Sequence, residues 1–393
     1  MNIAIDIRPL MDKNYSGVGE YTLNFLQAIF EEDRENRYFL FYNSADKKVR
    51  ERLPKFNYQN ATYCGFKFPN KFLNLSLFLL NWPKIDKLIE NKIKTIFVEA
   101  GPLQKSTKIE VFFTPNVNFT AISSECRHIV TVHDLSFEKF PEFYSFKGQL
   151  WHRIINLKRI LKKADRIIAI SENTKQDIME VYGLPSDKIK VILSGIKGYG
   201  PIAKNDSKLR AVKEKYNLPD KFILYLGNIE SRKNITGLIK AHEKISADYG
   251  LVIVGGKGWR SGEVYKFLSK AKNKNKIVLT GYVDREDKIY FYNLASAFVY
   301  PSYYEGFGLP PLEALACGVP VIAAYSSSLP EVVNSGAVMV DPFNIKDIEL
   351  ALRGVLGDAE LRARLQKEGF RLVKKLSWKS SAENFLKILR SDF

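Results

Sequence analysis

The sequence predicts an α/β protein built from two similar domains, each with a parallel sheet covered by helices on both faces. Short apolar runs with the length of buried strands alternate with stretches whose apolar residues recur at helical spacing, which is the pattern of such sheets. Residues 194–204 carry three glycines and a proline without periodicity, and they separate two sets of these elements. The length of 393 residues also favours two domains over one.

Each half of the chain supplies its own set of strands. The first set is expected at residues 2–7, 38–42, 111–115, 128–135, 166–171 and 189–193, with a helical segment at 147–164. The second set is expected at residues 222–226, 251–254, 277–279, 297–300 and 319–323, with helices that begin near Asn234, Ser261, Asp284 and Pro311. Ligands bind such sheets beyond the carboxyl ends of the strands, so the residues that follow each run are the candidates for function.

Composition restricts the class of protein. Sixty Lys and Arg against 43 Asp and Glu give a formal charge of +17, which favours polyanionic partners: nucleic acid, anionic lipid headgroups or phosphorylated small molecules. No motif of clustered basic and aromatic residues supports nucleic-acid binding. The three distant cysteines indicate a reducing compartment without disulfides or a metal cluster. The chain opens on a strand and has no apolar run of about 20 residues, so we expect a cytoplasmic protein.

The segment 67–94 has two interpretations. It combines the apolar run LNLSLFLLNW with six lysines, which is typical of a segment at a membrane interface. The run at 75–80 also fits a helix packed in the core. The two interpretations are compatible in a peripheral protein.

In the first half, two strand ends carry candidate residues. The first strand leads into Gly17-Val18-Gly19, interpreted as a glycine loop that approaches a ligand with its backbone before a helix starting at Tyr21. The fourth strand ends at His133 and Asp134, which we interpret as binding residues although a structural histidine is common at such a place.

In the second half, three loops suit the parts of a nucleotide. Arg232 and Lys233 stand just before a helix, where cations and free backbone amides attract phosphate. Gly256 lies in a glycine-rich loop that lets the backbone approach a ligand. Tyr282 and Val283 follow the next strand and offer main-chain hydrogen bonds to a nucleobase.

The stretch 300–324 places two carboxylates, Glu305 and Glu313, on either side of a glycine- and proline-rich turn. Two carboxylates would repel a phosphate, so we expect them to face a neutral group rich in hydroxyls, such as a sugar. The turn itself is the expected ligand-binding loop, followed by a helix whose first turn holds Glu313 and which ends at Cys317 and Gly318. The residues of this loop are Gly306, Phe307, Gly308 and Leu309.

These motifs together resemble the retaining glycosyltransferases of family 4 over nearly the whole chain. The resemblance implies the GT-B architecture, in which two Rossmann-like domains face each other across a cleft. It implies an acceptor-side domain at 1–196, joined by a helix at 377–393, and a nucleotide-sugar domain at 197–376. It further implies that Glu305 and His133 lie near the donor sugar, that Glu313 holds the ribose, and that Arg232 and Lys233 neutralise the diphosphate. Asn228 stands where many members of the family carry an arginine.

The resemblance also gives an expected reaction. It implies transfer of a hexose, with retention and without a metal or cofactor, from a nucleotide sugar to a saccharide or polyprenyl-linked acceptor. The runs around 113–116, 132–135 and 140–142 resemble bacterial mannosyl- and rhamnosyltransferases of polysaccharide or O-antigen synthesis, so GDP-mannose is the expected donor and a UDP-sugar the alternative. We also expect peripheral contact with the anionic inner face of the cell membrane. Alternative functions are a nucleotide-sugar epimerase or phosphorylase of the same architecture, or a polyanion-binding protein.

Overall fold

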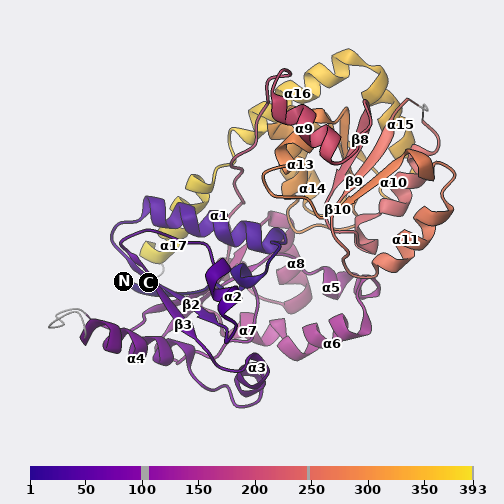
Figure 1. Ribbon diagram of the computed structural model, residues 1–393. Coiled ribbons are helices and arrows are strands. Elements are labelled where there is room, and N and C mark those ends of the chain that lie inside the picture. The colour runs from indigo at the N-terminus through magenta and orange to yellow at the C-terminus, as the bar shows by residue number, and fades with distance from the viewer. Residues whose placement is uncertain (99–105, 246–247, 392–393) are drawn as a thin grey trace. The chain divides into compact units, whose positions relative to one another are not determined.

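A computed structural model describes residues 1–98, 106–245 and 248–391 of the chain. The chain folds into two compact units, each around one sheet (Figure 1). Unit 1 consists of Met1–Leu135, Leu150–Gly195 and Trp378–Phe393. Unit 2 consists of Ser136–Gln149 and Ile196–Ser377. Each sheet is entirely parallel, which confirms the predicted fold class.

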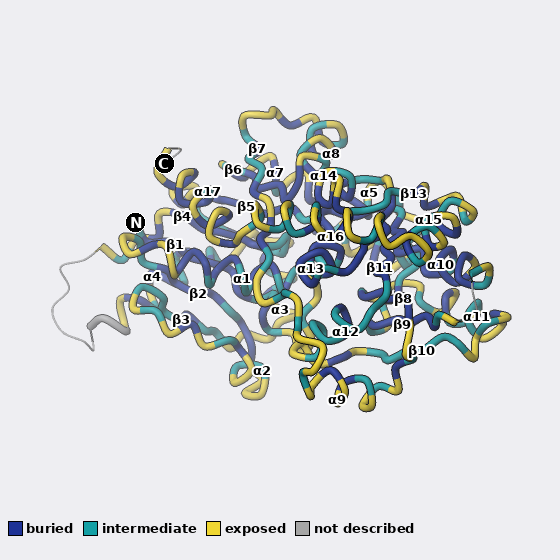
Figure 2. Tube along the Cα trace, turned by 90° about the horizontal axis from the view of Figure 1, so that it is seen from above, coloured by how far each residue is buried: buried dark blue, intermediate teal, exposed yellow. Residues whose placement is uncertain are grey.

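Unit 1 contains a seven-stranded sheet in the order β3-β2-β1-β4-β5-β6-β7. Its strands are β1 (Asn2–Asp6), β2 (Arg37–Asn43), β3 (Ala61–Phe66), β4 (Val111–Thr114), β5 (Arg127–Val132), β6 (Arg166–Ala169) and β7 (Ile189–Val191). The central strand β1 is buried along its whole length, so its apolar side chains pack on both faces of the sheet. Figure 2 shows this buried trace in dark blue.

The helices of unit 1 cover both faces of this sheet. They are α1 (Gly17–Glu32), α2 (Lys47–Arg52), α3 (Asn70–Leu79), α4 (Ile85–Val98), α7 (Leu157–Lys163), α8 (Glu172–Tyr182) and α17 (Trp378–Ser391), and α6 (Phe146–Ile155) spans the boundary of the units. The last helix, α17, packs beside α1 although more than 300 residues separate them in the chain. Its Phe385 ring lies 5.6 Å from Phe25 and 4.7 Å from Phe113, so α17 is part of the core of unit 1.

Unit 2 contains a six-stranded sheet in the order β10-β9-β8-β11-β12-β13. Its strands are β8 (Phe222–Leu226), β9 (Gly250–Val254), β10 (Ile277–Gly281), β11 (Ala297–Tyr300), β12 (Val321–Ala324) and β13 (Ala337–Val340). Its helices are α5 (Ser136–Lys139), α9 (Ser207–Lys215), α10 (Ile235–His242), α11 (Ser261–Lys270), α12 (Lys288–Leu294), α13 (Leu309–Ala316), α14 (Leu329–Val333), α15 (Ile345–Gly357) and α16 (Ala359–Val373). The strand order reverses direction between β8 and β11, which is where open α/β sheets bind ligands.

Several elements differ from the sequence prediction. The helix expected at 147–164 is two helices, because Asn156 adopts a left-handed conformation and its side chain caps α7. The glycines expected in a loop, Gly17 and Gly19, lie in the first turn of α1 after Ser16. A side chain at Gly19 would meet the Tyr15 ring, so that glycine permits close packing at the start of the helix.

Residues 136–149 were expected within the first domain, but they belong to unit 2. Aromatic contacts account for this assignment: the Phe143 ring stacks on Tyr303 at 5.6 Å, and the Phe140 ring lies 5.6 Å from Tyr304 at a tilt. The Arg260 guanidinium also donates to the carbonyl oxygen of Glu142 at 2.7 Å.

Candidate active site

Arg232 and Lys233 lie on a short 3-10 turn (Ser231–Lys233) between β8 and α10. The next residue, Asn234, adopts a left-handed conformation, and its side-chain oxygen accepts a hydrogen bond from the Gly237 amide, so it caps α10. This cap ends the turn and starts the helix directly beyond the cations. The two basic side chains therefore stand at the carboxyl end of the central strand β8.

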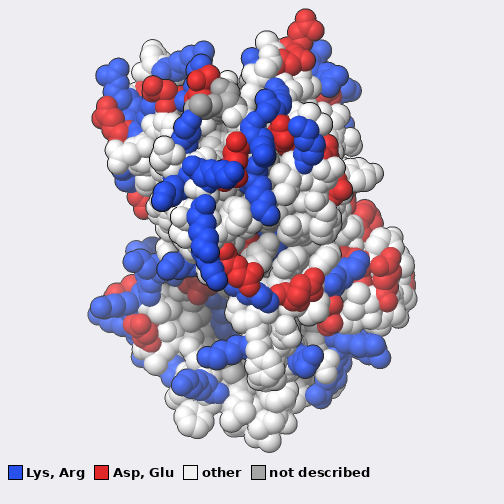
Figure 3. Space-filling model, turned by 90° about the vertical axis from the view of Figure 1, so that its right-hand side faces the viewer, with Lys and Arg blue, Asp and Glu red and all other residues white. Residues whose placement is uncertain are grey.

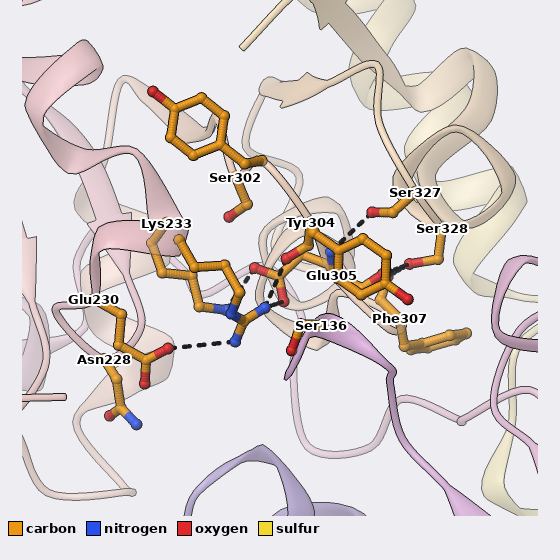
Figure 4. A network of polar contacts seen from close by, with 12 residues as sticks. Ser136, Asn228, Glu230, Lys233, Ser302, Tyr304, Glu305, Phe307, Ser327 and Ser328 are labelled. Carbon is orange, nitrogen blue, oxygen red and sulfur yellow. Dashed lines mark hydrogen bonds and ion pairs between the residues drawn. The ribbon is translucent and has the colours of Figure 1, made fainter. Parts of the chain in front are cut away.

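Glu305 binds both cations (Figure 4). Its Oε2 lies 3.0 Å from Arg232 Nη1 and its Oε1 lies 2.5 Å from Lys233 Nζ. Lys233 also donates to the Tyr300 hydroxyl at 2.8 Å, and Arg232 donates to the Tyr304 carbonyl at 2.7 Å. Arg232 and Lys233 were expected at the diphosphate and Glu305 beside the sugar. The three side chains therefore form one buried cluster.

The charges of this cluster are balanced. A second carboxylate, Glu230, lies 3.4 Å from Arg232 Nη2, so two cations face two anions. All four side chains are at least 87% removed from solvent. Burial alone would raise the pKa of the Glu305 carboxyl, but the charges of Arg232 and Lys233 outweigh burial and lower this pKa to about 2. Glu305 is therefore an ionised acceptor and not a general acid near neutral pH.

The loop that carries Glu305 is fixed by serines that follow β12. The Glu305 amide donates to Ser327 Oγ at 2.8 Å, and Ser328 Oγ donates to the carbonyls of Glu305 and Phe307 (Figure 4). Gly308 has a φ of 103°, a conformation that L side chains rarely adopt, and it is the N-cap of α13. The backbone at the start of α13 is thus held in place before any ligand binds.

Glu313 lies in the second turn of α13, not in the first turn as expected, because the helix begins at Leu309. Its Oε2 accepts a hydrogen bond of 2.7 Å from the Tyr292 hydroxyl. The Tyr292 ring is fully buried, so the hydrogen bond fixes the orientation of the half-buried carboxylate. A carboxylate is a hydrogen-bond acceptor that suits the hydroxyls of a ribose.

The glycine loop after β9 approaches the end of β8 very closely. A Cβ atom at Gly255 would stand 1.9 Å from the carbonyl oxygen of Gly227, whereas one at Gly256 would meet nothing within 4 Å. Gly256 therefore borders open space at the carboxyl edge of the sheet. Beyond the neighbouring strand β10, Tyr282 is exposed and Val283 is buried.

In unit 1, His133 follows the carboxyl end of β5. Its Nε2 lies 2.8 Å from the Pro115 carbonyl, which can only accept, so this nitrogen carries the proton. The Tyr21 ring stands against the imidazole edge-on, with centroids 4.8 Å apart. Burial lowers the pKa of His133 below its usual value, so the ring is neutral and Nδ1 can accept a hydrogen bond. Asp134 follows it and is half-buried.

Two protein-family models match successive parts of this chain. The family described as Glycosyltransferase Family 4 matches residues 15–197, and the one described as Glycosyl transferases group 1 matches residues 207–372. The O-antigen chain mannosyltransferase B of Escherichia coli is 33% identical over 65% of this chain and 68% of the relative. The chain belongs to the family 4 glycosyltransferases.

Solved structures show the same fold for this glycosyltransferase. Sucrose-phosphate synthase from Thermosynechococcus elongatus has a TM-score of 0.73 at 20% identity, over 99% of this chain and 98% of that one. The Anabaena protein HepE, solved in complex with UDP-glucose, has a TM-score of 0.71 at 15% identity over the full length of both chains. The match to longer mannosyltransferases of Escherichia coli spans only about a third of their length.

The structure of the glycosyltransferase gathers the unit 2 candidates along one edge of the sheet. They follow β8, β9, β10 and β11 in turn, whereas Gly17, Gly19, His133 and Asp134 lie in unit 1. Sequence reasoning missed Glu230, Tyr300 and the serines at 326–328. Glu230 had a recognisable signal, since it stands two residues before Arg232. The serines had none, because their partners are backbone atoms more than 20 residues away.

Proposed function

We propose that this glycosyltransferase moves a mannosyl residue from GDP-mannose to a hydroxyl of a saccharide or polyprenyl-linked acceptor in glycan synthesis, with retention of the anomeric configuration. The similarity to O-antigen chain mannosyltransferase B supports the sugar and the pathway class. A UDP-sugar is the alternative donor, because HepE, which has the same fold, was solved with UDP-glucose.

The observation that carries this proposal is the buried cluster of Arg232, Lys233 and Glu305 at the carboxyl end of β8 and β11. A desolvated pair of cations is costly unless anions balance it. Glu305 and Glu230 supply that balance here, and a diphosphate beside the cluster would share Arg232 and Lys233 with them. The role of Glu305 is then to hold the two cations in place and to meet the sugar with the rest of its oxygen lone pairs.

The proposed step breaks the bond between the anomeric carbon and the diphosphate oxygen, which departs with the electron pair. Arg232, Lys233 and the backbone amides of Gly308 and Leu309, which precede the two prolines of α13, stabilise the charge that develops on this oxygen. The acceptor oxygen forms its bond to the anomeric carbon on the same face. Its proton passes to the departing diphosphate, so the configuration is retained and no protein base is needed.

We propose that this step proceeds without a metal ion, because two cationic side chains and helix-end amides already supply positive charge at the leaving group. The sequence contains no Asp-x-Asp motif of the kind that holds a metal on a nucleotide sugar. Neutral His133 would accept a hydrogen bond from a sugar hydroxyl through Nδ1. Asn228, where many family members carry arginine, leaves Arg232 and Lys233 as the charged groups for the diphosphate.

We further propose that the protein acts at the cytoplasmic face of an anionic membrane, where a polyprenyl-linked acceptor would reside. None of the helices in the described residues is long and apolar enough to cross a bilayer. The net charge of +17 favours attraction to anionic lipid. This contact would be peripheral.

A thermal-shift screen tests the donor. A ligand that binds only the folded protein raises the melting temperature by mass action, so GDP-mannose should give the largest shift among GDP-, UDP-, dTDP- and ADP-sugars. Incubation of GDP-mannose without acceptor then separates the alternatives. Conversion to another nucleotide sugar would indicate an epimerase, and a pyridoxal absorbance band in the purified protein would indicate a phosphorylase.

A further inference from the structure

One helix of unit 1 exposes an unusually large apolar surface. Phe72, Leu79 and Leu80 are 73%, 64% and 70% exposed, and Trp82 just beyond the helix is 63% exposed. The opposite side of the same helix, α3, buries Leu73 and Leu77 in the core. The core interpretation of this segment therefore holds for one face of the helix, and the other face is exposed and apolar, as the interface interpretation requires. We call the exposed set Phe72, Leu75, Leu79, Leu80 and Trp82 the α3 apolar face.

A cavity of about 740 Å³ adjoins this helix. Leu77 and Phe78 of α3 line one side of it, and Phe119 lies 6.0 Å from Phe78, ring to ring. Residues of α6 and α7 line another side. The cavity thus has an apolar wall that continues into the α3 apolar face.

Four cations also line the cavity. Lys84, Arg153, Arg159 and Lys163 line it, and Asp165 is its one carboxylate. In the part of the chain that the structure describes, none of these four cations forms an ion pair, whereas other lysines of the same region do: Lys87 binds Glu90 at 3.1 Å. The lower end of the view in Figure 3, where Figure 1 places α3, shows uncharged surface bordered by Lys and Arg.

Asp165 and His128 do not cancel this positive charge. Asp165 already accepts a hydrogen bond of 2.7 Å from the His128 amide. Burial lowers the pKa of His128 to about 3, so this ring is neutral, and its Nε2 contacts Thr114 Oγ1 at 2.8 Å. The lining therefore has a net formal charge of +3, which favours an anionic group.

The cavity is separate from the candidate donor residues of unit 1. His128 is the second residue of β5, whereas His133 follows the carboxyl end of the same strand. Five residues of extended chain place the two histidines about 16 Å apart, at opposite ends of β5. A ligand in the cavity would therefore leave the His133 edge free.

We propose that this cavity binds the phosphate headgroup of an anionic phospholipid while the α3 apolar face enters the acyl layer of the bilayer. A phospholipid joins an anionic headgroup, which would occupy the cavity, to hydrocarbon chains, which would lie along Phe78 and the exposed face. Trp82 and the bordering lysines suit the interfacial zone between them. The inference deepens the membrane contact proposed above by naming the site.

Sedimentation of the full-length protein with vesicles tests the proposal. Wild-type protein should bind vesicles of phosphatidylcholine with about 30% phosphatidylglycerol at least tenfold more tightly than vesicles of phosphatidylcholine alone, and added salt should weaken binding. The variant Arg153→Glu/Arg159→Glu should lose at least tenfold in binding. The matched control Lys208→Glu/Arg210→Glu changes the net charge equally on an exposed helix of unit 2 and should bind like wild type.

A second pair tests insertion. Phe72→Ser/Leu79→Ser should also lose at least tenfold, whereas Leu350→Ser, which removes an exposed leucine in unit 2, should bind like wild type. All the replaced side chains are exposed, so the variants should keep the wild-type melting temperature, and circular dichroism checks this. Equal losses in Arg153→Glu/Arg159→Glu and its control would overturn the site but leave membrane contact standing. No binding by wild-type protein to either vesicle would overturn both.

Discussion

Glu305 determines how the candidate donor site is organised at the scale of single residues. One carboxylate contacts an arginine and a lysine that are adjacent in sequence, and each is nearly buried. Sequence reasoning identified all three residues and placed them at strand ends, because motifs and the positions of apolar runs are local. The sequence prediction placed Glu305 at the sugar and the two cations at the diphosphate. It could not show that the three side chains touch, because neither loop encodes its distance from the other.

The pKa of Glu305 leads to a prediction about stability. Since this pKa is about 2 in the folded protein and about 4.5 when unfolded, the carboxylate stabilises the fold fully above the unfolded value and loses this effect as the pH falls towards 2. Replacement Glu305→Gln should therefore lower the free energy of unfolding at neutral pH by on the order of 3 kcal/mol. The difference from wild type should shrink steadily with acidification.

Urea unfolding from neutral pH down to the lowest pH at which the protein folds measures this difference. Asp341→Asn, at an exposed carboxylate of unit 2, serves as a control that should show little change. A constant difference between wild type and Glu305→Gln at every pH would contradict the assigned ionisation.

The rate of transfer should not change with pH in the range where an unperturbed histidine titrates. All four histidines of the chain, His128, His133, His152 and His242, have pKa values lowered by burial. We therefore expect initial rates of transfer at saturating donor to show no step near pH 6.5, where an unperturbed histidine titrates. A clear loss of rate through that pH that disappears in His133→Gln would mean that His133 works as a charged group or a base.

At the scale of elements, the ends of β8 and β9 make the closest backbone contact at the donor edge. Gly255 has a φ of 152° and lies against the Gly227 carbonyl. Replacement Gly255→Ala should force these two strand ends apart and cost on the order of 3 kcal/mol of stability. Thermal unfolding measures the loss.

Gly256→Ala provides the matched control, because a Cβ at this neighbouring position meets nothing within 4 Å. It should unfold at nearly the wild-type temperature, while donor binding weakens if the open space beside it holds the nucleotide sugar. Equal stability of the two variants would show that the close approach is not required by the fold.

Apolar periodicity predicted most elements well, and its failures have physical reasons. Strands β8 and β11 have the expected bounds, because they are buried along their length and their apolar runs are unbroken. The edge strands β3 and β13 were missed, since most of their residues are only half-buried. Helix α1 was expected to begin at Tyr21, because glycine is a poor helix former. It begins at Gly17, and close contact with Tyr15 favours glycine at position 19.

At the scale of the whole molecule, the sequence predicted two parallel-sheet domains but not every boundary between them. The segment 136–149 belongs to unit 2 through ring contacts with Tyr303 and Tyr304, which no local pattern reveals. Likewise, the excess of positive charge is visible in the composition, but its concentration around one cavity in unit 1 depends on the packing of α3, α6 and α7.

The most direct test of the central claim is the affinity of the protein for GDP-mannose, measured by calorimetry with wild type, Lys233→Ala and the exposed control Lys270→Ala. Loss of a buried cation that faces the diphosphate should weaken binding at least tenfold in Lys233→Ala, provided that its melting curve shows a folded protein, and should leave Lys270→Ala unchanged. Equal affinity of all three proteins for GDP-mannose would contradict the assignment of this cluster as the diphosphate site.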